Sequence, residues 1–434
     1  MLRTLASLTT LIAAASLVNL ANATMTTIMP LRLLEDGASG TVVALFGAVF
    51  FLGFAIGCFS QPPLIERVGY IRAFAATAAV CTILAVVMDR LDSVKYWLAL
   101  RFLMGVSLAA VFAAVDGWIN GTTTDAMRGK VFATYGWCLG ASAVVSQLVL
   151  TRFDGMSPGF ITVLALAFNL GLVLVAMTRS AAPSTALEKE KGAEAARPAK
   201  ARRGLVFTSG VSVATAIYAG LVATAILSIL PATLAGGGVD DEAIGAVIGA
   251  FFLGRLLLQI PLGVVADRMD LRLLVAIIAG LTGATALVGA LLVKFGLADL
   301  SPGVGRGGRL LFLAIMTTLG GLVLPLYTLA NSLAFARARG LPAARVATSL
   351  LLVNSAGSVA GPLLVAGATP ILGTHALPAV VGAASGLMVA AALAARRSAP
   401  PEPATVGFSF IPATSVTSSG SMAEAKYEEA PGPE

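Results

Sequence analysis

The stretch Gly263-Val264-Val265-Ala266-Asp267-Arg268-Met269-Asp270-Leu271-Arg272 is a short charged turn between two long apolar segments. A weaker copy, Ile65-Glu66-Arg67-Val68-Gly69-Tyr70-Ile71-Arg72, lies about 200 residues earlier. In both copies an acid precedes an arginine, and a further arginine follows at nearly the same offset. Self-similarity at such a long period indicates a chain built from two related halves.

The composition places the chain in a membrane. Its 434 residues are 57% hydrophobic and 12% charged, and the mean hydropathy is +0.91, whereas soluble domains average about 25% charged residues. Most side chains must therefore face something other than water. We expect an all-α integral membrane protein whose main partner is the lipid bilayer.

A spanning helix needs about 20 mainly apolar residues. By that rule the sequence predicts about twelve transmembrane helices in two pseudo-symmetric six-helix bundles. The expected spans are 5–29, 41–61, 72–89, 96–118, 130–150, 159–178, 205–234, 242–263, 272–294, 308–330, 344–368 and 376–396. This predicts an N-terminal bundle over 1–179, a charged linker over 180–204, a C-terminal bundle over 205–397 and a disordered tail over 398–434.

The distribution of basic residues predicts the orientation. Most of the 29 lysines and arginines fall in loops on the side of the N-terminus, in the linker or in the tail. Cytoplasmic loops carry the excess of positive charge, so we expect both termini to lie in the cytoplasm. We expect the protein itself to lie in the inner membrane. The same bias explains the net charge of +7 without a nucleic-acid partner.

The six-plus-six pattern with charged turns after spans two and eight resembles the major facilitator superfamily (MFS). The signature of that family in this turn is roughly G-x-x-x-D-R-x-G-R-(R/K). The second-half copy keeps Gly263, Asp267, Arg268 and Arg272, and has Asp270 at the second glycine. The resemblance covers about residues 1–397. It implies the MFS fold, alternating access, and a cavity lined by spans one, four, seven and ten.

Within the superfamily the chain is most similar to the YcaD-like branch of bacterial transporters. The matching segments are Glu66-Arg67-Val68-Gly69-Tyr70-Ile71-Arg72-Ala73-Phe74-Ala75, Val115-Asp116-Gly117-Trp118-Ile119-Asn120, Gln259-Ile260-Pro261-Leu262-Gly263 and Pro325-Leu326-Tyr327. The polar residues that the branch carries after the last segment are replaced here by Leu333, Phe335 and Ala336. The branch implies a mechanism class and gives little information about the substrate.

The charged turns are the predicted gate. Surface ion pairs are worth only about 0–1 kcal/mol, so they can break reversibly as two bundles rock against each other. The alternative is that these charges only anchor the loops on the inner side. The resemblance implies gating roles for Glu66, Arg67, Arg72, Asp116, Asp267, Arg268 and Arg272. Asp116 is a predicted partner for Arg67 or a proton site, and its alternative is a solvated carboxylate at a helix end.

Two arginines lie within predicted spans. Arg255 is deep in span eight, where a charge costs about 2.5–3.5 kcal/mol even on insertion scales. An anionic substrate is one compensation, and a structural ion pair is the alternative. Arg101 lies near the outer end of span four, where it either snorkels or faces a substrate.

Polar residues within the spans complete the predicted substrate site. They are Asn19, Asn22, Tyr218, Gln259, Tyr327 and Asn331, with Asn354 as a further cavity candidate. Each is equally explained by a hydrogen bond between helices. By contrast, we interpret Gly53-x-x-x-Gly57 and Gly357-x-x-x-Gly361 as close helix contacts.

These observations predict a secondary-active transporter of a small molecule, proton-coupled, with an anionic substrate as a hypothesis. The alternatives are a multidrug or metabolite efflux pump and a non-transporting membrane receptor or scaffold. We expect a monomer without cofactor, metal or enzymatic activity. The chain has a single histidine, and its three cysteines lack metal-ligand spacing.

Overall fold

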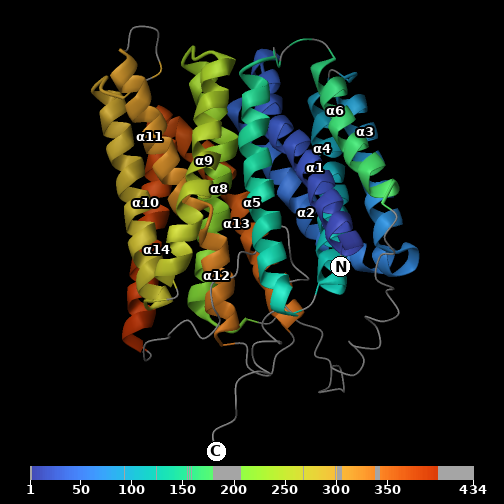
Figure 1. Ribbon diagram of the computed structural model, residues 1–434. Coiled ribbons are helices and arrows are strands. Elements are labelled where there is room, and N and C mark those ends of the chain that lie inside the picture. Colours follow the sequence, from blue (N-terminus) through green and yellow to red (C-terminus); the bar gives the residue numbers. More distant parts are fainter. Residues whose placement is uncertain are drawn as a thin grey trace, which may run out of the picture.

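The protein is described by a computed structural model (Figure 1). It describes residues 2–91, 93–123, 125–153, 155, 157, 159–178, 207–266, 268–298, 300, 305–337 and 343–398. The predicted linker and almost all of the predicted tail lie outside these residues, as does Asp267.

All regular elements of the described residues are helical. Those of the first half are α1 (Leu2–Glu35), α2 (Gly40–Val68), α3 (Tyr70–Met88), α4 (Val94–Thr122), α5 (Asp125–Leu150) and α6 (Phe160–Ala176). Those of the second half are α8 (Gly210–Gly236), α9 (Asp241–Ala266), α10 (Leu271–Lys294), α11 (Arg306–Val323), α12 (Leu326–Phe335), α13 (Ala343–Leu372), the short 3-10 helix η1 (Gly373–His375) and α14 (Ala376–Ser398).

The helices form two groups that lie side by side, each with six segments that cross the membrane (Figure 1). In the described residues, nine segments are long and apolar enough to span a membrane; one of them holds both α13 and α14. Another joins α11 and α12, which are interrupted at Leu324–Pro325 because proline cannot continue the backbone hydrogen bonding of a helix. With the shorter apolar helices in α5 and α6, this confirms the predicted twelve crossings.

Close helix contacts in both halves depend on glycine. A Cβ atom added at Gly53 of α2 would collide with the carbonyl oxygen of Phe102 in α4. A Cβ at Gly357 of α13 would collide in the same way with Ile217 in α8. Glycine is therefore required for the backbones to approach, which confirms the predicted role of the two glycine pairs.

The halves meet through α2 with α13 and α5 with α9. Glycines again allow close contact: Gly47 of α2 lies against Ser228 of α8, and Gly245 of α9 lies against Gln147 of α5. We call the end of the molecule where α1 begins and α14 ends the terminal face, and the other end the opposite face. The glycine contacts between the halves are near the opposite face.

The first charged turn is shorter than the sequence suggests. α2 continues through Glu66 and Arg67 to Val68, and α3 already begins at Tyr70. Only Gly69 lies between them, with a φ of 81° that is easy for glycine and strained for other residues. Glu66 and Arg67 are thus held on the last turn of a helix and point into solvent at the terminal face.

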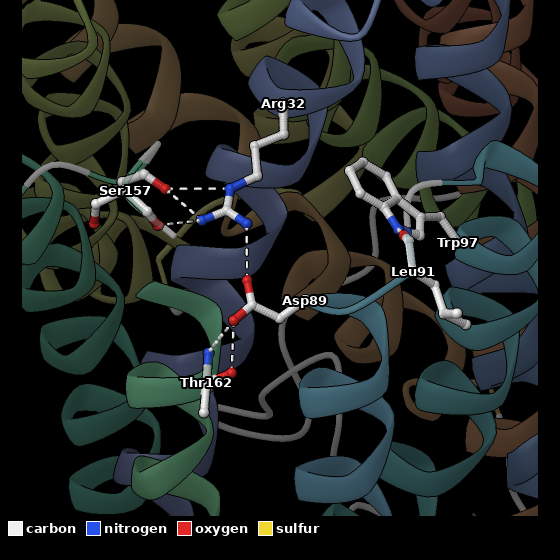
Figure 2. Close-up of polar contacts among 7 residues, drawn as sticks. Arg32, Asp89, Leu91, Trp97, Ser157 and Thr162 are labelled. Carbon is white, nitrogen blue, oxygen red and sulfur yellow. Dashed lines mark hydrogen bonds and ion pairs between the residues drawn. The ribbon is translucent and has the colours of Figure 1, made fainter. Parts of the chain in front are cut away.

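A buried ion pair fastens the opposite face of the first half (Figure 2). Arg32 of α1 lies 3.0 Å from a carboxylate oxygen of Asp89, and the two side chains are only 14% and 2% exposed. Arg32 also donates to the carbonyl oxygens of Gly155 and Ser157, while Asp89 accepts from the backbone and hydroxyl of Thr162. The pair thereby links the ends of α1 and α3 to the start of α6.

Candidate functional site: a central cavity between the halves

A cavity of about 230 Å³ lies between the two halves. Its wall is formed by α1, α2, α4 and α5 of the first half and by α8, α9 and α13 of the second. The broken tenth span contributes none of the described lining residues, which differs from the expected set of spans one, four, seven and ten. Spans one, four and seven do line it.

The wall combines an aromatic surface with a few polar groups. Phenylalanines dominate the apolar part, and amides and hydroxyls form the polar part. The lining residues are Asn19, Asn22, Ala23, Thr26, Phe50, Phe51, Phe54, Phe112, Leu139, Ala143, Leu227, Phe252, Arg255, Leu351, Asn354 and Ser355. A largely apolar wall with a few convergent polar groups is typical of a small-molecule site.

Arg255 is the one charged residue among these described lining residues. Its position thirteen or so residues into α9 places the guanidinium near mid-membrane, at about 20 Å from the helix start. The Nε atom lies 3.5 Å from Oε1 of Gln259, one turn further along the helix. Arg255 therefore gives the cavity wall a positive charge, whereas Gln259 is buried beside it and is not among the described lining residues.

The amides of the cavity wall also bind neighbouring helices. Asn19 donates to the carbonyl oxygen of Leu139 at 3.0 Å and to the hydroxyl of Ser142 at 2.9 Å. Asn354 donates to the carbonyl oxygen of Ala216 at 2.9 Å. These bonds fix the amide planes, so that each amide presents a defined polar edge to the cavity.

Arg101 lies behind the cavity wall and does not line it. It is 1% exposed and donates to the hydroxyl of Thr26 at 2.7 Å and to the amide oxygen of Asn22 at 3.3 Å. Its guanidinium carbon lies 4.2 Å from the ring centre of Phe50, a cation–π geometry. Arg101 thus holds three wall residues in place instead of snorkelling to the surface.

Asp116 of α4 is fully buried, and neither carboxylate oxygen has a hydrogen-bond partner among the described residues. The predicted pairing with Arg67 is absent, because Arg67 is exposed at the end of α2. Cys58 of α2 lies within electrostatic range of Asp116, and Tyr327 of the second half lies within range of Cys58.

The remaining predicted cavity residues lie outside the wall. Tyr218 forms a 2.7 Å hydrogen bond with Ser385, which joins α8 to α14 within the second half. Asn331 donates to the backbone oxygen of Tyr327 at 2.9 Å, and both are buried. The Tyr218 bond matches the alternative of a hydrogen bond between helices, whereas the Asn331 bond lies within α12.

The second charged turn is braced within its own half. Asp270 caps the start of α10 by accepting from the backbone N–H of Arg272 at 2.9 Å, and its carboxylate also lies 3.4 Å from the Arg272 side chain. Arg272 is 1% exposed and donates to the carbonyl oxygen of Ala395 in α14 at 3.0 Å. Arg268 and Arg72 are exposed. Arg272 is therefore a buried brace, unlike the exposed charges expected of a reversible latch.

Thr26, Phe50 and Ser355 were missed by sequence reasoning. Thr26 had a signal, because Asn19, Asn22 and Thr26 are spaced by three and four residues and so share one face of α1. The phenylalanines of the wall had no such signal in the sequence, because apolar residues fill every span. Within the described chain, no cluster of three or more histidine, cysteine or acidic residues could hold a metal ion.

The sequence profile of the Major Facilitator Superfamily matches residues 11–238. The chain belongs to this superfamily. YcaD, an uncharacterized MFS-type transporter of Shigella flexneri serotype 5b (strain 8401), is 24% identical over 263 residues, or 60% of this chain and 66% of the relative. YcaD of Escherichia coli (strain K12 / DH10B) is 24% identical over the same length. The match spans slightly less than two thirds of these relatives, and it bears out the resemblance to the YcaD-like branch.

Solved transporters share the fold. A mutant of the nucleoside transporter NupG superposes with a TM-score of 0.69 over 89% of this chain and 99% of that chain, at 10% identity. A POT family transporter in complex with 5-aminolevulinic acid gives 0.67 over 91% and 96%, at 13% identity. A D-xylose-proton symporter gives 0.62 over 93% and 97%, at 14% identity. At these identities the likeness extends to the fold alone.

Proposed function

We propose that this MFS protein is a secondary-active transporter that moves a small organic anion with an aromatic or apolar body through the central cavity. The observation that carries the proposal is Arg255. It places the single charge of the described cavity wall opposite phenylalanines, in a space of about 230 Å³. A guanidinium binds carboxylates through paired hydrogen bonds, and the rings supply apolar contact area.

Alternating access supplies the mechanism. In transporters with repeated halves, one bundle rocks against the other around a site near mid-membrane. The cavity occupies that position, and the glycine contacts of α2 with α8 and of α5 with α9 lie on its opposite-face side. The exposed charges Glu66, Arg67, Arg72 and Arg268 stay proposed as a latch on the terminal face. By the positive-inside rule that face is the cytoplasmic one.

Asp116 is the proposed coupling site for protons. An ionised carboxylate is costly in a dry interior unless it gains a partner. Asp116 is fully buried without a hydrogen-bond partner among the described residues, and it lies within electrostatic range of Cys58 of α2. Movement of the halves would change its surroundings, so that a proton binds in one conformation and leaves in the other.

The test is transport by purified protein in liposomes that are exposed to a mixture of organic anions under a proton gradient. We expect one or more aromatic carboxylates to accumulate with wild-type protein, and accumulation to fall at least tenfold with Arg255→Gln, because a charged hydrogen bond is lost. Arg90→Gln, which removes an exposed arginine from the opposite face, is the matched control.

Each result has a clear meaning. Equal uptake by Arg255→Gln and wild type would refute an anionic substrate, and uptake of cations instead would favour the efflux alternative. A non-transporting scaffold predicts no flux of any compound. It also predicts that Arg67→Ala has no phenotype at normal abundance, whereas a transporter loses flux.

A further inference from the structure

A second cavity, of about 380 Å³, lies inside the C-terminal bundle at the opposite face. It is bounded by α8, α10, α11 and the start of α14, and it shares no lining residue with the central cavity. Its walls are apolar, with Leu230, Phe312 and Met316 among them. Lys294, at the end of α10, and His375, in η1, are its exposed basic residues.

At the corresponding place in the first half, the helix ends are joined by polar side chains. There the end of α1, the end of α3 and the start of α6 are joined by Arg32, Asp89 and Thr162, as Figure 2 shows. The related ends of α8, α10 and α14 instead surround the hollow. Protein interiors are close-packed, so a hollow of this size is not expected unless something occupies it.

The lining chemistry identifies the ligand class. No acidic residue is among the described lining residues, while Lys294 supplies a positive charge and His375 a hydrogen-bond donor at the same end. The apolar walls suit an alkyl chain, and the volume lies at the lower end of the range for small-molecule sites. This favours one chain with a compact anionic head over a two-chain phospholipid.

We propose that the cavity between α8, α10, α11 and α14 binds a single-chain anionic amphiphile of the fatty-acid type, with its carboxylate at Lys294 and His375. The site is separate from the central cavity, so the proposal does not depend on the transported substrate. The ligand would enter the C-terminal bundle from the lipid phase, near the opposite face.

The test is equilibrium binding of radiolabelled dodecanoate to the full-length protein in nanodiscs of phosphatidylcholine. We expect the affinity to rise about fourfold for each added methylene from octanoate to dodecanoate, since every buried methylene contributes a constant increment. Dodecanol should compete about tenfold more weakly than dodecanoate, because it lacks the charge that Lys294 recognises.

Variants locate the ligand. Ala290 lines the cavity and is half-buried, so Ala290→Phe should fill it and abolish binding. Lys294→Gln should weaken dodecanoate about tenfold and leave dodecanol unchanged. Arg306→Gln removes an exposed arginine at the same face that does not line the cavity, and should bind as wild type does.

Four results would overturn the proposal. One is wild-type affinity in a monodisperse Ala290→Phe protein, and another is equal competition by dodecanol. The third is loss of binding in Arg255→Gln with retention in Ala290→Phe, which would place the ligand in the central cavity. Displacement by equimolar phosphatidylglycerol would overturn the choice of a single-chain ligand in favour of bilayer phospholipid.

Discussion

Replacement of Asp270 should destabilise the C-terminal bundle by a calculable amount. Its carboxylate caps α10 through the backbone N–H of Arg272 and forms an ion pair with the buried Arg272 side chain. Loss of an N-cap costs about 1 kcal/mol, and loss of a charged hydrogen bond costs about 2 kcal/mol. Asp270→Ala should therefore lower the free energy of unfolding by about 3 kcal/mol.

Two further variants separate the cap from the charge. Asn is as good a cap as Asp, so Asp270→Asn should lose only about 2 kcal/mol. Asp240 accepts from the backbone N–H of Ala243 at 2.7 Å and caps α9 in the same way at an exposed site. Asp240→Ala is the matched control for the cap alone and should lose about 1 kcal/mol.

The assay is the fraction of detergent-purified protein that stays monodisperse after heating, measured by size-exclusion chromatography. All three tryptophans of the chain (Trp97, Trp118 and Trp137) lie in the first half. Intrinsic fluorescence would therefore mainly report unfolding of the N-terminal bundle, whereas the variants lie in the C-terminal bundle. A shift for Asp270→Ala no larger than that for Asp240→Ala would refute the contribution of the Asp270–Arg272 ion pair. If Asp270→Asn were as damaging as Asp270→Ala, the contribution of the cap would be refuted instead.

Three other changes test separate parts of the account. Gly357→Val should cost at least 1–3 kcal/mol by overpacking against Ile217, whereas Gly367→Val, with open space at its Cβ, should be near neutral in the same heating assay. Asp89→Asn should cost about 3–5 kcal/mol and reduce membrane abundance, because Arg32 loses the charge of its buried partner. Asp116→Asn should abolish stimulation of liposome uptake by a proton gradient while substrate exchange without a gradient continues; retained stimulation would exclude Asp116 as the coupling group.

The repeated charged turn predicted two related halves, and the lengths of the apolar runs predicted the twelve crossings. A membrane span is recognised by the length of its apolar run, so its prediction does not depend on the exact residues at which it begins and ends. The glycine pairs in α2 and α13 were also readable, since small residues at a spacing of four mark close helix contacts. Helix ends were less readable, because α2 extends beyond its apolar part to include Glu66 and Arg67.

The pairing of side chains could not be predicted. Arg32 and Asp89 are 57 positions apart, and Arg101 reaches Thr26 across 75. Such contacts depend on how each helix is rotated about its axis, which apolar patterns in a lipid environment specify poorly, since every face is apolar. For the same reason the sequence named Arg101 and Tyr218 beside Arg255 as candidate substrate contacts, and only the structure shows that Arg255 alone of the three lines the cavity.

The most direct test of the central claim is ligand-induced thermal stabilisation of the purified protein across aromatic carboxylates and their neutral amides, with wild type and Arg255→Gln. A ligand at 100 times its Kd stabilises the folded state by about 2.7 kcal/mol. The account predicts that at least one carboxylate raises the melting temperature of wild type, that its amide does not, and that Arg255→Gln loses the response while remaining folded. An equal response from the amide, or from Arg255→Gln, would contradict it.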